Sequence, residues 1–231
     1  MGEILRVSNI SKTFGENNSK VNALTDLSFS ITAQTFTSII GRSGSGKTTL
    51  LNMIGGLEAP TSGEIQINNM NPYQLNDDKR SEFRRRNIGY VFQFFNLLPE
   101  LTAYDNICLP SYLDHHYPDK TFLKQVTNQL SLDSLLDKFP GELSGGEQQR
   151  VAVARALSCM PKIILADEPT GNLDKKSGNE LMDLLHFSCR LFKQTILLVT
   201  HDLEIARSAD RIITLEDGRI LSDLSGEFYE E

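Results

Sequence analysis

Residues 41–48 read Gly41-Arg42-Ser43-Gly44-Ser45-Gly46-Lys47-Thr48, which fits the pattern G-x-x-x-x-G-K-[ST] of a phosphate-binding loop. The stretch follows the apolar run Thr37–Ile40 and opens the helical pattern Thr49–Ile54, and the motif requires this strand-to-helix context. Glycines let backbone N–H groups turn toward a triphosphate, and the helix N-terminus favours negative charge. An ordinary turn between strand and helix would explain the glycines but not the Lys47-Thr48 pair.

The motif assigns roles to its residues. Lys47 is expected to reach the β- and γ-phosphates of ATP, and the Thr48 hydroxyl to bind Mg²⁺. The other residues expected to bind the nucleotide are Gly41, Ser43, Gly44, Ser45, Gly46 and Thr49.

A second apolar run, Ile163–Ala166, ends in Asp167-Glu168. Ligands of open α/β sheets bind outside the carboxyl ends of parallel strands. Asp167 suits Mg²⁺, directly or through water, and Glu168 then stands beside the metal, free to polarise an attacking water. By itself such a pair is as often a solvated turn or a helix cap, and the phosphate loop favours the catalytic interpretation.

A histidine follows a third buried run. His201 comes directly after Ile196–Thr200, so an imidazole at this strand end could contact the γ-phosphate of ATP. A lone histidine in such a place is more often a structural or capping residue. Both interpretations stay open at this point.

The spacing of apolar residues predicts an α/β fold. Four runs rich in β-branched residues predict a mostly parallel sheet covered by helices; they are Thr37–Ile40, Ile163–Ala166, Ile196–Thr200 and Ile212–Leu215. Three runs that alternate predict an antiparallel flank near the N-terminus; they are Ile4–Val7, Leu27–Ile31 and Glu64–Ile67. Asp217-Gly218 predicts the turn of a hairpin.

Between Val91 and about Met160 the strand signal disappears, and spacings such as Phe122, Val126 and Leu130 suit helices. We expect one P-loop NTPase domain over residues 1–231. Its core and β flank would be formed by residues 1–92 and 161–231, and residues from about 93 to 160 would form an inserted helical lobe.

Composition narrows the function classes. With 23 Lys and Arg against 30 Asp and Glu, the net charge is −7, which argues against nucleic acid as a partner. No apolar stretch is long enough to span a membrane, and the N-terminus lacks the pattern of a signal peptide, so we expect the chain itself to stay in the cytoplasm. Cys108, Cys159 and Cys189 lack the spacing of metal ligands and suit reduced thiols.

A further motif reveals a family resemblance. Residues 143–150 read Leu143-Ser144-Gly145-Gly146-Glu147-Gln148-Gln149-Arg150, and this segment, placed between the phosphate loop and the acidic strand, resembles the ATP-binding cassette (ABC) transporter ATPases. Other marks of that family follow the same order along the chain: Gln93, Asp167-Glu168-Pro169-Thr170, Leu173-Asp174 and Thr200-His201-Asp202.

The resemblance implies an ATP-dependent homodimer. The phosphate loop of one subunit and the LSGG segment of the second would close around one ATP, so that Ser144, Gly145 and Gly146 touch a γ-phosphate held by the partner's Lys47. The same residues also fit a helix cap, in which Ser144 and Glu147 form a capping box. Both interpretations can hold at once.

The resemblance also assigns Gln93 and Phe14. Gln93 would sense the γ-phosphate and Mg²⁺ while it joins the core to the helical lobe. Phe14 stands where an aromatic ring usually stacks on adenine, although an aromatic residue near the N-terminus also suits simple core packing.

Within the family, the chain resembles the separate ATPases of lipoprotein-releasing, macrolide-exporting and bacitracin-resistance complexes. The segments that carry this likeness are Arg84–Arg86, Ile88–Gln93, Phe95–Pro99 and Leu101–Ile107, with a polar hairpin tip at Glu16–Lys20. The resemblance implies an ATPase on the inner face of the cell membrane that drives a separate permease, for export or extraction of a peptide, lipoprotein or antimicrobial. Arg84–Arg86 would equally suit a solvated basic face.

The permease would dock near Gln93. Phe94, Phe95, Leu97 and Leu98 are candidates to receive it, and packing of the helical lobe would explain the same residues. Two other functions remain open: a related ATPase that acts on DNA or ribosomes, and a P-loop phosphotransferase. A co-purifying permease, co-purifying nucleic acid or ribosomes, or a phosphorylated product without free phosphate would distinguish the three.

Overall fold

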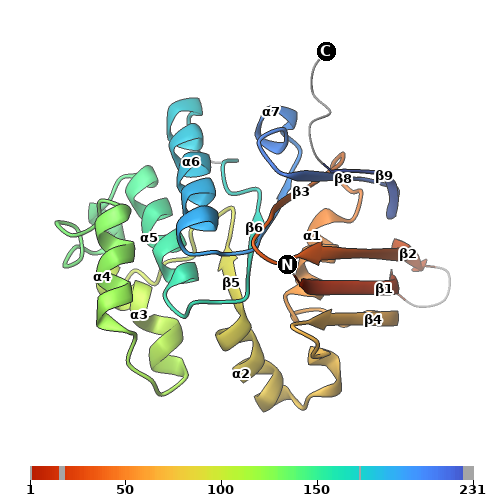
Figure 1. Ribbon diagram of the computed structural model, residues 1–231, viewed down its shortest axis with the longest axis horizontal. Coiled ribbons are helices and arrows are strands. Elements are labelled where there is room, and N and C mark those ends of the chain that lie inside the picture. Colours follow the sequence, from red (N-terminus) through yellow and green to blue (C-terminus); the bar gives the residue numbers. More distant parts are fainter. Residues whose placement is uncertain (1, 16–18, 172, 226–231) are drawn as a thin grey trace.

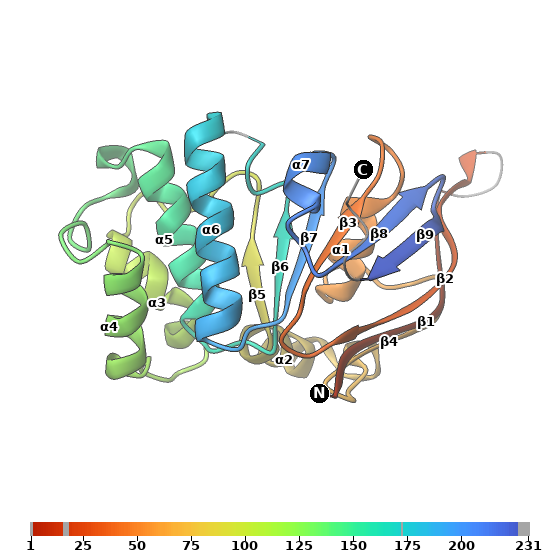
Figure 2. The same cartoon turned by 45° about the horizontal axis from the view of Figure 1, so that its top comes forward.

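The computed structural model describes residues 2–15, 19–171 and 173–225. Its centre is a six-stranded sheet in the order β5-β6-β7-β3-β8-β9, drawn in Figures 1 and 2. The strands are β3 (Phe36–Ile40), β5 (Ile88–Val91), β6 (Ile163–Asp167), β7 (Ile196–Thr200), β8 (Arg211–Glu216) and β9 (Arg219–Ser225). All neighbours pair in parallel except β8 and β9. The four apolar runs expected in a parallel sheet are therefore confirmed.

Strand β5 is one element that the apolar pattern did not reveal. It has only four residues, too few to show a period. Its Gly89 matters for packing, because a Cβ there would stand 2.5 Å from the carbonyl oxygen of Ala156. Glycine thus lets β5 approach the end of helix α5 (Gly145–Leu157).

The antiparallel flank forms a separate sheet in the order β2-β1-β4. Its strands are β1 (Glu3–Phe14), β2 (Val21–Thr32) and β4 (Ser62–Ile67). The pairing of β1 with β2 shifts register several times, and Asn9 and Asp26, both with positive φ, lie at two of these shifts. Because such irregularities break the alternation of side chains, the sequence predicted only part of each long strand.

Helices cover both faces of the large sheet. They are α1 (Lys47–Ile54), α2 (Asp77–Asn87), α3 (Ala103–Leu113), α4 (Lys120–Gln129), α5 (Gly145–Leu157), α6 (Lys175–Leu191) and α7 (Leu203–Ala206), with short 3₁₀ turns η2 (Pro72–Gln74) and η3 (Pro140–Glu142). Consecutive strand residues enter different cores: Ile164 joins the cluster with α3 to α6, and Leu165 joins the one with α1 and the antiparallel sheet. Burial on both faces explains the continuous apolar runs.

The remaining predictions concern two hairpins, the cysteines and membrane-spanning helices. The Asp217-Gly218 turn is confirmed, with φ of 46° and 72° as a two-residue hairpin requires. The hairpin tip expected at Glu16–Lys20 includes residues 16–18, which lie outside the described residues. All three cysteines are free thiols. Within residues 2–15, 19–171 and 173–225, no helix combines the length and apolar character needed to cross a membrane.

Sheet register brings three strand ends together. Ile40 at the end of β3 pairs with Thr200 at the end of β7, and Asp167 at the end of β6 pairs with Val199. The residues that follow these strands therefore meet at one edge of the sheet, because parallel strands present their carboxyl ends on the same side.

Candidate nucleotide-binding site

The loop between β3 and α1 has the backbone that its glycines permit. Gly44 and Gly46 have φ of 81° and 99°, which side chains disfavour. A Cβ on Gly46 would stand 2.5 Å from Leu24 Cδ2, and one on Gly41 would stand 2.2 Å from the carbonyl oxygen of Leu215. The glycines therefore serve both conformation and close packing against β2 and β8.

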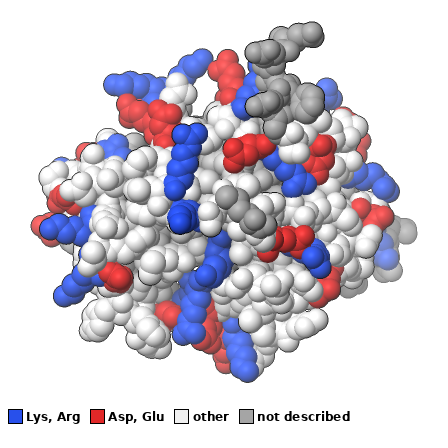
Figure 3. Space-filling view, viewed as in Figure 1, with Lys and Arg blue, Asp and Glu red and all other residues white. Residues whose placement is uncertain are grey.

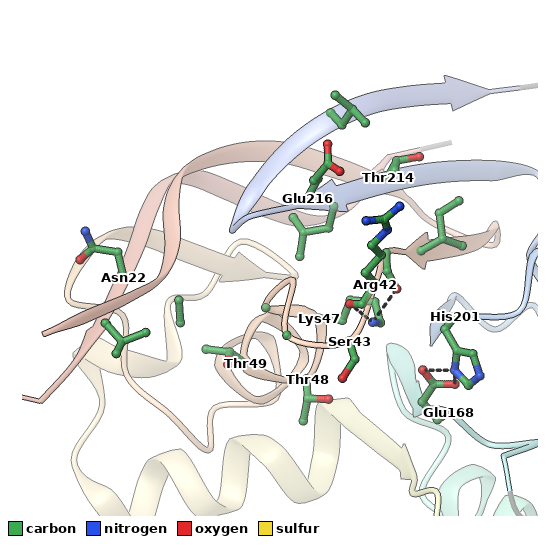
Figure 4. Close-up of a pocket in the computed structure, with 18 of the residues that line it drawn as sticks. Asn22, Arg42, Ser43, Lys47, Thr48, Thr49, Glu168, His201, Thr214 and Glu216 are labelled. Carbon is green, nitrogen blue, oxygen red and sulfur yellow. Dashed lines mark hydrogen bonds and ion pairs between the residues drawn. The ribbon is translucent and has the colours of Figure 1, made fainter. Parts of the chain in front are cut away.

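Lys47 is buried at the first position of α1, with 7% of its surface exposed. Its Nζ donates hydrogen bonds to the carbonyl oxygens of Gly41 and Arg42, at 2.8 and 2.9 Å, which Figure 4 shows as dashed lines. The ammonium group is thus held inside the curve of the loop, where a phosphate would meet it.

Thr48 and Asp167 bring two oxygen ligands together. The Thr48 hydroxyl donates to Asp167 Oδ1 at 3.4 Å. Burial raises the pKa of Asp167, and the neighbouring charge of Glu168 adds to this, against the effect of the Thr48 hydrogen bond. A hydroxyl and a desolvated carboxylate are ligands that suit Mg²⁺, so the residues present fit that ion.

The described residues contain no group of three or more His, Cys, Asp and Glu side chains placed to hold a metal ion. Proteins usually bind Mg²⁺ through one or two side chains together with substrate phosphates.

Glu168 and His201 contact each other. His201 Nδ1 lies 2.9 Å from both carboxylate oxygens of Glu168, and Thr200 Oγ1 donates to Oε2 at 3.4 Å. Glu168 has a φ of 44°, a region that is strained for a residue other than glycine. Its backbone N–H donates to Val199, and its carbonyl accepts from Gly171, so two main-chain bonds hold this conformation.

Several of these groups line one pocket of about 920 Å³, shown in Figure 4. Of the predicted site residues, its lining includes Gly41, Ser43, Gly44, Gly46, Lys47, Thr48, Thr49, Glu168 and His201. Asp167 is not among the lining residues and reaches the site through its hydrogen bond with Thr48. Ser45 is buried beneath the β8-β9 turn instead, where its carbonyl accepts from the N–H of Gly218.

The pocket also has walls that the motifs did not indicate. Val21, Asn22 and Ala23 come from β2, and Thr214, Leu215, Glu216 and Leu221 come from β8 and β9. None of them belongs to a recognisable motif. These wall residues line the pocket because β2 packs closely against Gly46 and β8 packs closely against Gly41. The sequence carries no other signal for them.

Phe14 lies at the end of β1 and does not line this pocket. Phe14 is 41% exposed, and Lys12 Nζ stands 4.9 Å from the centre of its ring. Its strand partner Val21 does line the pocket, so Phe14 stands beside the pocket rather than in its wall.

Gln93 follows β5 and lies against the turn after Glu168. A Cβ on Gly171 would stand 3.1 Å from Gln93 Nε2, and Gly171 N donates to the carbonyl of Glu168 at 3.0 Å. Of the apolar residues that follow, Phe94 is 69% and Leu98 43% exposed, whereas Leu97 packs against the helical core.

The LSGG segment begins α5 and does not line the pocket. Ser144 is the N-cap, and its N–H and hydroxyl both contact Glu147 Oε2 at 2.7 Å, which confirms the predicted capping box. The hydrogen bonds from Ser144 lower the pKa of Glu147. In both views α5 lies among the helices, on the other side of β5 and β6 from α1.

Comparisons with known proteins agree with this geometry. The model of the protein family described as "ABC transporter" matches residues 24–171 of this chain. The chain is 43% identical over 223 residues to MJ0796, an ABC transporter ATP-binding protein of Methanocaldococcus jannaschii, covering 94% of this chain and 95% of that protein. It is 42% identical over 218 residues to LolD, the lipoprotein-releasing system ATP-binding protein of Acinetobacter baylyi, covering 93% and 96%.

A solved structure is similar over the whole length. The dimeric post-hydrolysis structure of MJ0796 bound to ADP and Pi has a TM-score of 0.87 and 39% identity, and the alignment covers 98% of this chain and 100% of that one. The expected fold class is thereby confirmed. The chain belongs to the ABC transporter family and is an ATP-binding cassette ATPase.

Proposed function

We propose that two copies of this chain close around ATP and hydrolyse it to ADP and phosphate, and that this cycle drives a separate membrane permease. One observation carries the proposal: the phosphate loop, Glu168 and His201 line one pocket, whereas Ser144 begins a helix outside it. A pocket that lacks its own LSGG segment is completed by the segment of a second chain. The dimeric structures of MJ0796 support this arrangement.

Within each chain the proposed roles follow from position. Glu168 aligns and deprotonates the attacking water, while Lys47 and the loop N–H groups stabilise negative charge on the phosphates. His201 holds the γ-phosphate or the water in line. Thr48, Asp167 and Gln93 would hold Mg²⁺, which when bound neutralises charge on the β- and γ-phosphates.

The remaining proposed contacts lie at the edges of the pocket. Phe14 would stack on adenine from beside the wall that Val21 forms. From the partner chain, the Ser144 hydroxyl and the N–H groups of Gly145 and Gly146 would face the γ-phosphate, because a helix N-terminus binds anions. Ser45 would support the loop from beneath.

Mixing two inactive variants tests the shared site. Lys47→Ala removes the phosphate-binding side chain but leaves the LSGG segment, and Ser144→Arg blocks that segment but leaves the loop. Each variant should be inactive as a homodimer. Their mixture contains a heterodimer with one complete site, so ATP-dependent dimerisation, with partial ATPase activity, should appear only in the mixture.

The readout is light scattering with ATP, combined with release of phosphate. Ser62→Arg is a matched control that should keep full activity, because it makes the same change at an exposed serine of β4, outside the LSGG segment. Full activity of Ser144→Arg alone, or a mixture that forms no ATP-dependent dimer, contradicts the shared site.

We also propose that the permease docks on the exposed residues Phe94 and Leu98. The resemblance to LolD favours export or extraction of a lipoprotein, peptide or antimicrobial, with the chain on the inner face of the membrane. Residues 1–231 would act as one unit, in which residues from about 93 to 160 form the lobe that meets the permease.

Isolation of the tagged chain from membranes tests the docking site. A membrane protein should co-purify with the wild type and be lost with Phe94→Glu. Leu191→Glu is the control, because Leu191 is also an exposed leucine, at 49%, but lies on α6. Equal recovery with both variants would place the docking site elsewhere.

A further inference from the structure

Arg155 lies in the last turn of α5 and holds the main chain of another segment. Its Nη1 donates to the carbonyl oxygen of Asn96 at 2.6 Å, and its Nη2 donates to that of Phe95 at 2.8 Å. A guanidinium presents its donors in a rigid plane. Two successive carbonyls bonded to it are therefore fixed in orientation as well as position.

The environment of Arg155 indicates a positional role. Burial lowers the pKa of its guanidinium, and its hydrogen bonds among the described residues go to carbonyl groups and not to a carboxylate. Placing a cation in a desolvated site without a neutralising charge costs free energy. The two hydrogen bonds offset part of this cost, and they fix the backbone of residues 95 and 96.

The Phe95 ring also lies near the opposite end of the same helix. Its Cζ lies 3.9 Å from the point where a Cβ on Gly145 would stand, and Gly145 is the first residue of α5. Asn96 has a φ of 49°, a turn of the chain that asparagine tolerates. The Phe95 ring therefore lies near the LSGG end of α5, while the Phe95 carbonyl is held by Arg155 in the last turn.

Two residues earlier, Gln93 lies against Gly171, whose N–H donates to Glu168. Residues 93–96, which we call the bridging segment, thus join the turn that carries Glu168 to the helix that begins with LSGG. Phe94 is the exposed residue between these anchored neighbours.

We propose that Arg155 is a positioning residue that fixes the bridging segment to α5, so that Gln93 and the Ser144–Gly146 segment move as one body. This inference rests on the proposed function. A displacement of Phe94 by the permease would then reorient the LSGG segment toward the partner's ATP. Without Arg155 the same displacement would move only the bridging segment and not α5.

Two variants test this role. Arg155→Lys keeps the charge and can satisfy one carbonyl, and Arg155→Met keeps the apolar stem and satisfies neither. Both are made in the Glu168→Gln background, so that ATP stays bound. We expect ATP-dependent dimerisation to weaken about tenfold for Arg155→Met, and less for Arg155→Lys. ATP binding to the single chain, measured by calorimetry at low protein concentration, should not change.

Val153→Ala is the control on the same helix. Val153 is fully buried in the helical core, so its truncation lowers stability without touching residues 95 and 96. Dimerisation is compared at the same interval below each variant's Tm. Equal weakening by Val153→Ala and Arg155→Met, or loss of ATP binding by the single chain, would overturn the positioning role.

Amide hydrogen exchange gives a readout that does not require a dimer. Exchange in residues 93–98 of the single chain should quicken with Arg155→Met and, to a smaller extent, with Arg155→Lys, but not with Val153→Ala. Unchanged exchange there overturns the inference. If the Glu168→Gln chain itself fails to dimerise with ATP, the shared site fails, whereas the exchange result still decides the role of Arg155.

Discussion

His201 Nδ1 stands 2.9 Å from both carboxylate oxygens of Glu168. One imidazole nitrogen therefore faces the whole carboxylate, at the point where the ends of β6 and β7 meet. The Glu168 side chain is largely buried, with 17% exposed, while that of His201 is 69% exposed. The exposed imidazole thus contacts an otherwise sheltered carboxylate, as the dashed lines in Figure 4 show.

Glu168→Gln should bind ATP with Mg²⁺ and form a stable dimer yet hydrolyse ATP about 10²- to 10⁴-fold more slowly, because the amide keeps the shape but cannot act as a base. Phosphate release and light scattering measure the two effects. Glu180→Gln, at an exposed glutamate of α6, is the control and should keep full activity. Near-normal hydrolysis by Glu168→Gln would move the base elsewhere, with His201 the next candidate.

His201→Ala should lower kcat by about 10²-fold, because it removes the group that contacts Glu168 and is proposed to hold the γ-phosphate or the attacking water in line. His116→Ala is a close control. That histidine also contacts a carboxylate, Asp114, and its side chain is 68% exposed. If His201→Ala has the same kcat as His116→Ala, His201 has only a structural role.

Lys47→Ala should weaken ATP binding at least about tenfold, because the triphosphate loses a buried cation and the carbonyls of Gly41 and Arg42 lose their donor. Calorimetry with ATP measures the change. Lys176→Ala, at a lysine whose side chain is 86% exposed, should bind as the wild type does. Unchanged affinity of Lys47→Ala would refute the assignment of the phosphate loop.

Gly46→Ala should destabilise the protein more than Gly44→Ala does. Both glycines have positive φ, but a Cβ on Gly44 has nothing within 4 Å, whereas one on Gly46 would meet Leu24 at 2.5 Å. The backbone term costs about 1–2 kcal/mol at either position, and the clash adds about 1–3 kcal/mol at Gly46. Urea unfolding of the two variants measures the difference, and equal losses would contradict the packing argument.

Asp114→Asn should lower stability at neutral pH by about 1 kcal/mol. Asp114 follows α3 and accepts a hydrogen bond from Arg86 of α2 at 2.7 Å. Although its partial burial acts in the opposite direction, the hydrogen bond and charge of Arg86 hold the pKa of Asp114 below its usual value.

The sign of the pH dependence follows from that lowered pKa. The stabilising contribution is present above the unfolded pKa and is lost as pH falls through the folded one. The difference in free energy of unfolding between wild type and Asp114→Asn should therefore be constant down to about pH 4 and shrink below it. A difference that grows as the pH falls would contradict this assignment.

Motifs and local patterns carried much of the prediction. The strand-to-helix context of the phosphate loop placed Lys47 and Thr48, and the ends of buried apolar runs placed Glu168 and His201. These signals are local because an N–H cradle, a buried strand and a helix cap each depend on a few consecutive residues. The net charge of −7 also follows directly from the residue composition. Figure 3 shows acidic side chains interspersed with basic ones on one face of the protein.

Other features depend on residues that are distant in the sequence. Strand β5 is too short to have a period and exists because it pairs with β6. Val21, Asn22, Thr214 and Glu216 line the pocket only because β2 and β8 approach the loop.

The sequence alone determined the chemistry of the phosphate loop and where along the chain the buried strands lie, because these follow from residue type and spacing. Tertiary structure decided which groups meet. Register between β6 and β7 brings His201 to Glu168, and packing along α5 brings Arg155 to the carbonyls of Phe95 and Asn96. The physical reason is that contacts between distant segments depend on how whole elements pack, which no short stretch of sequence encodes.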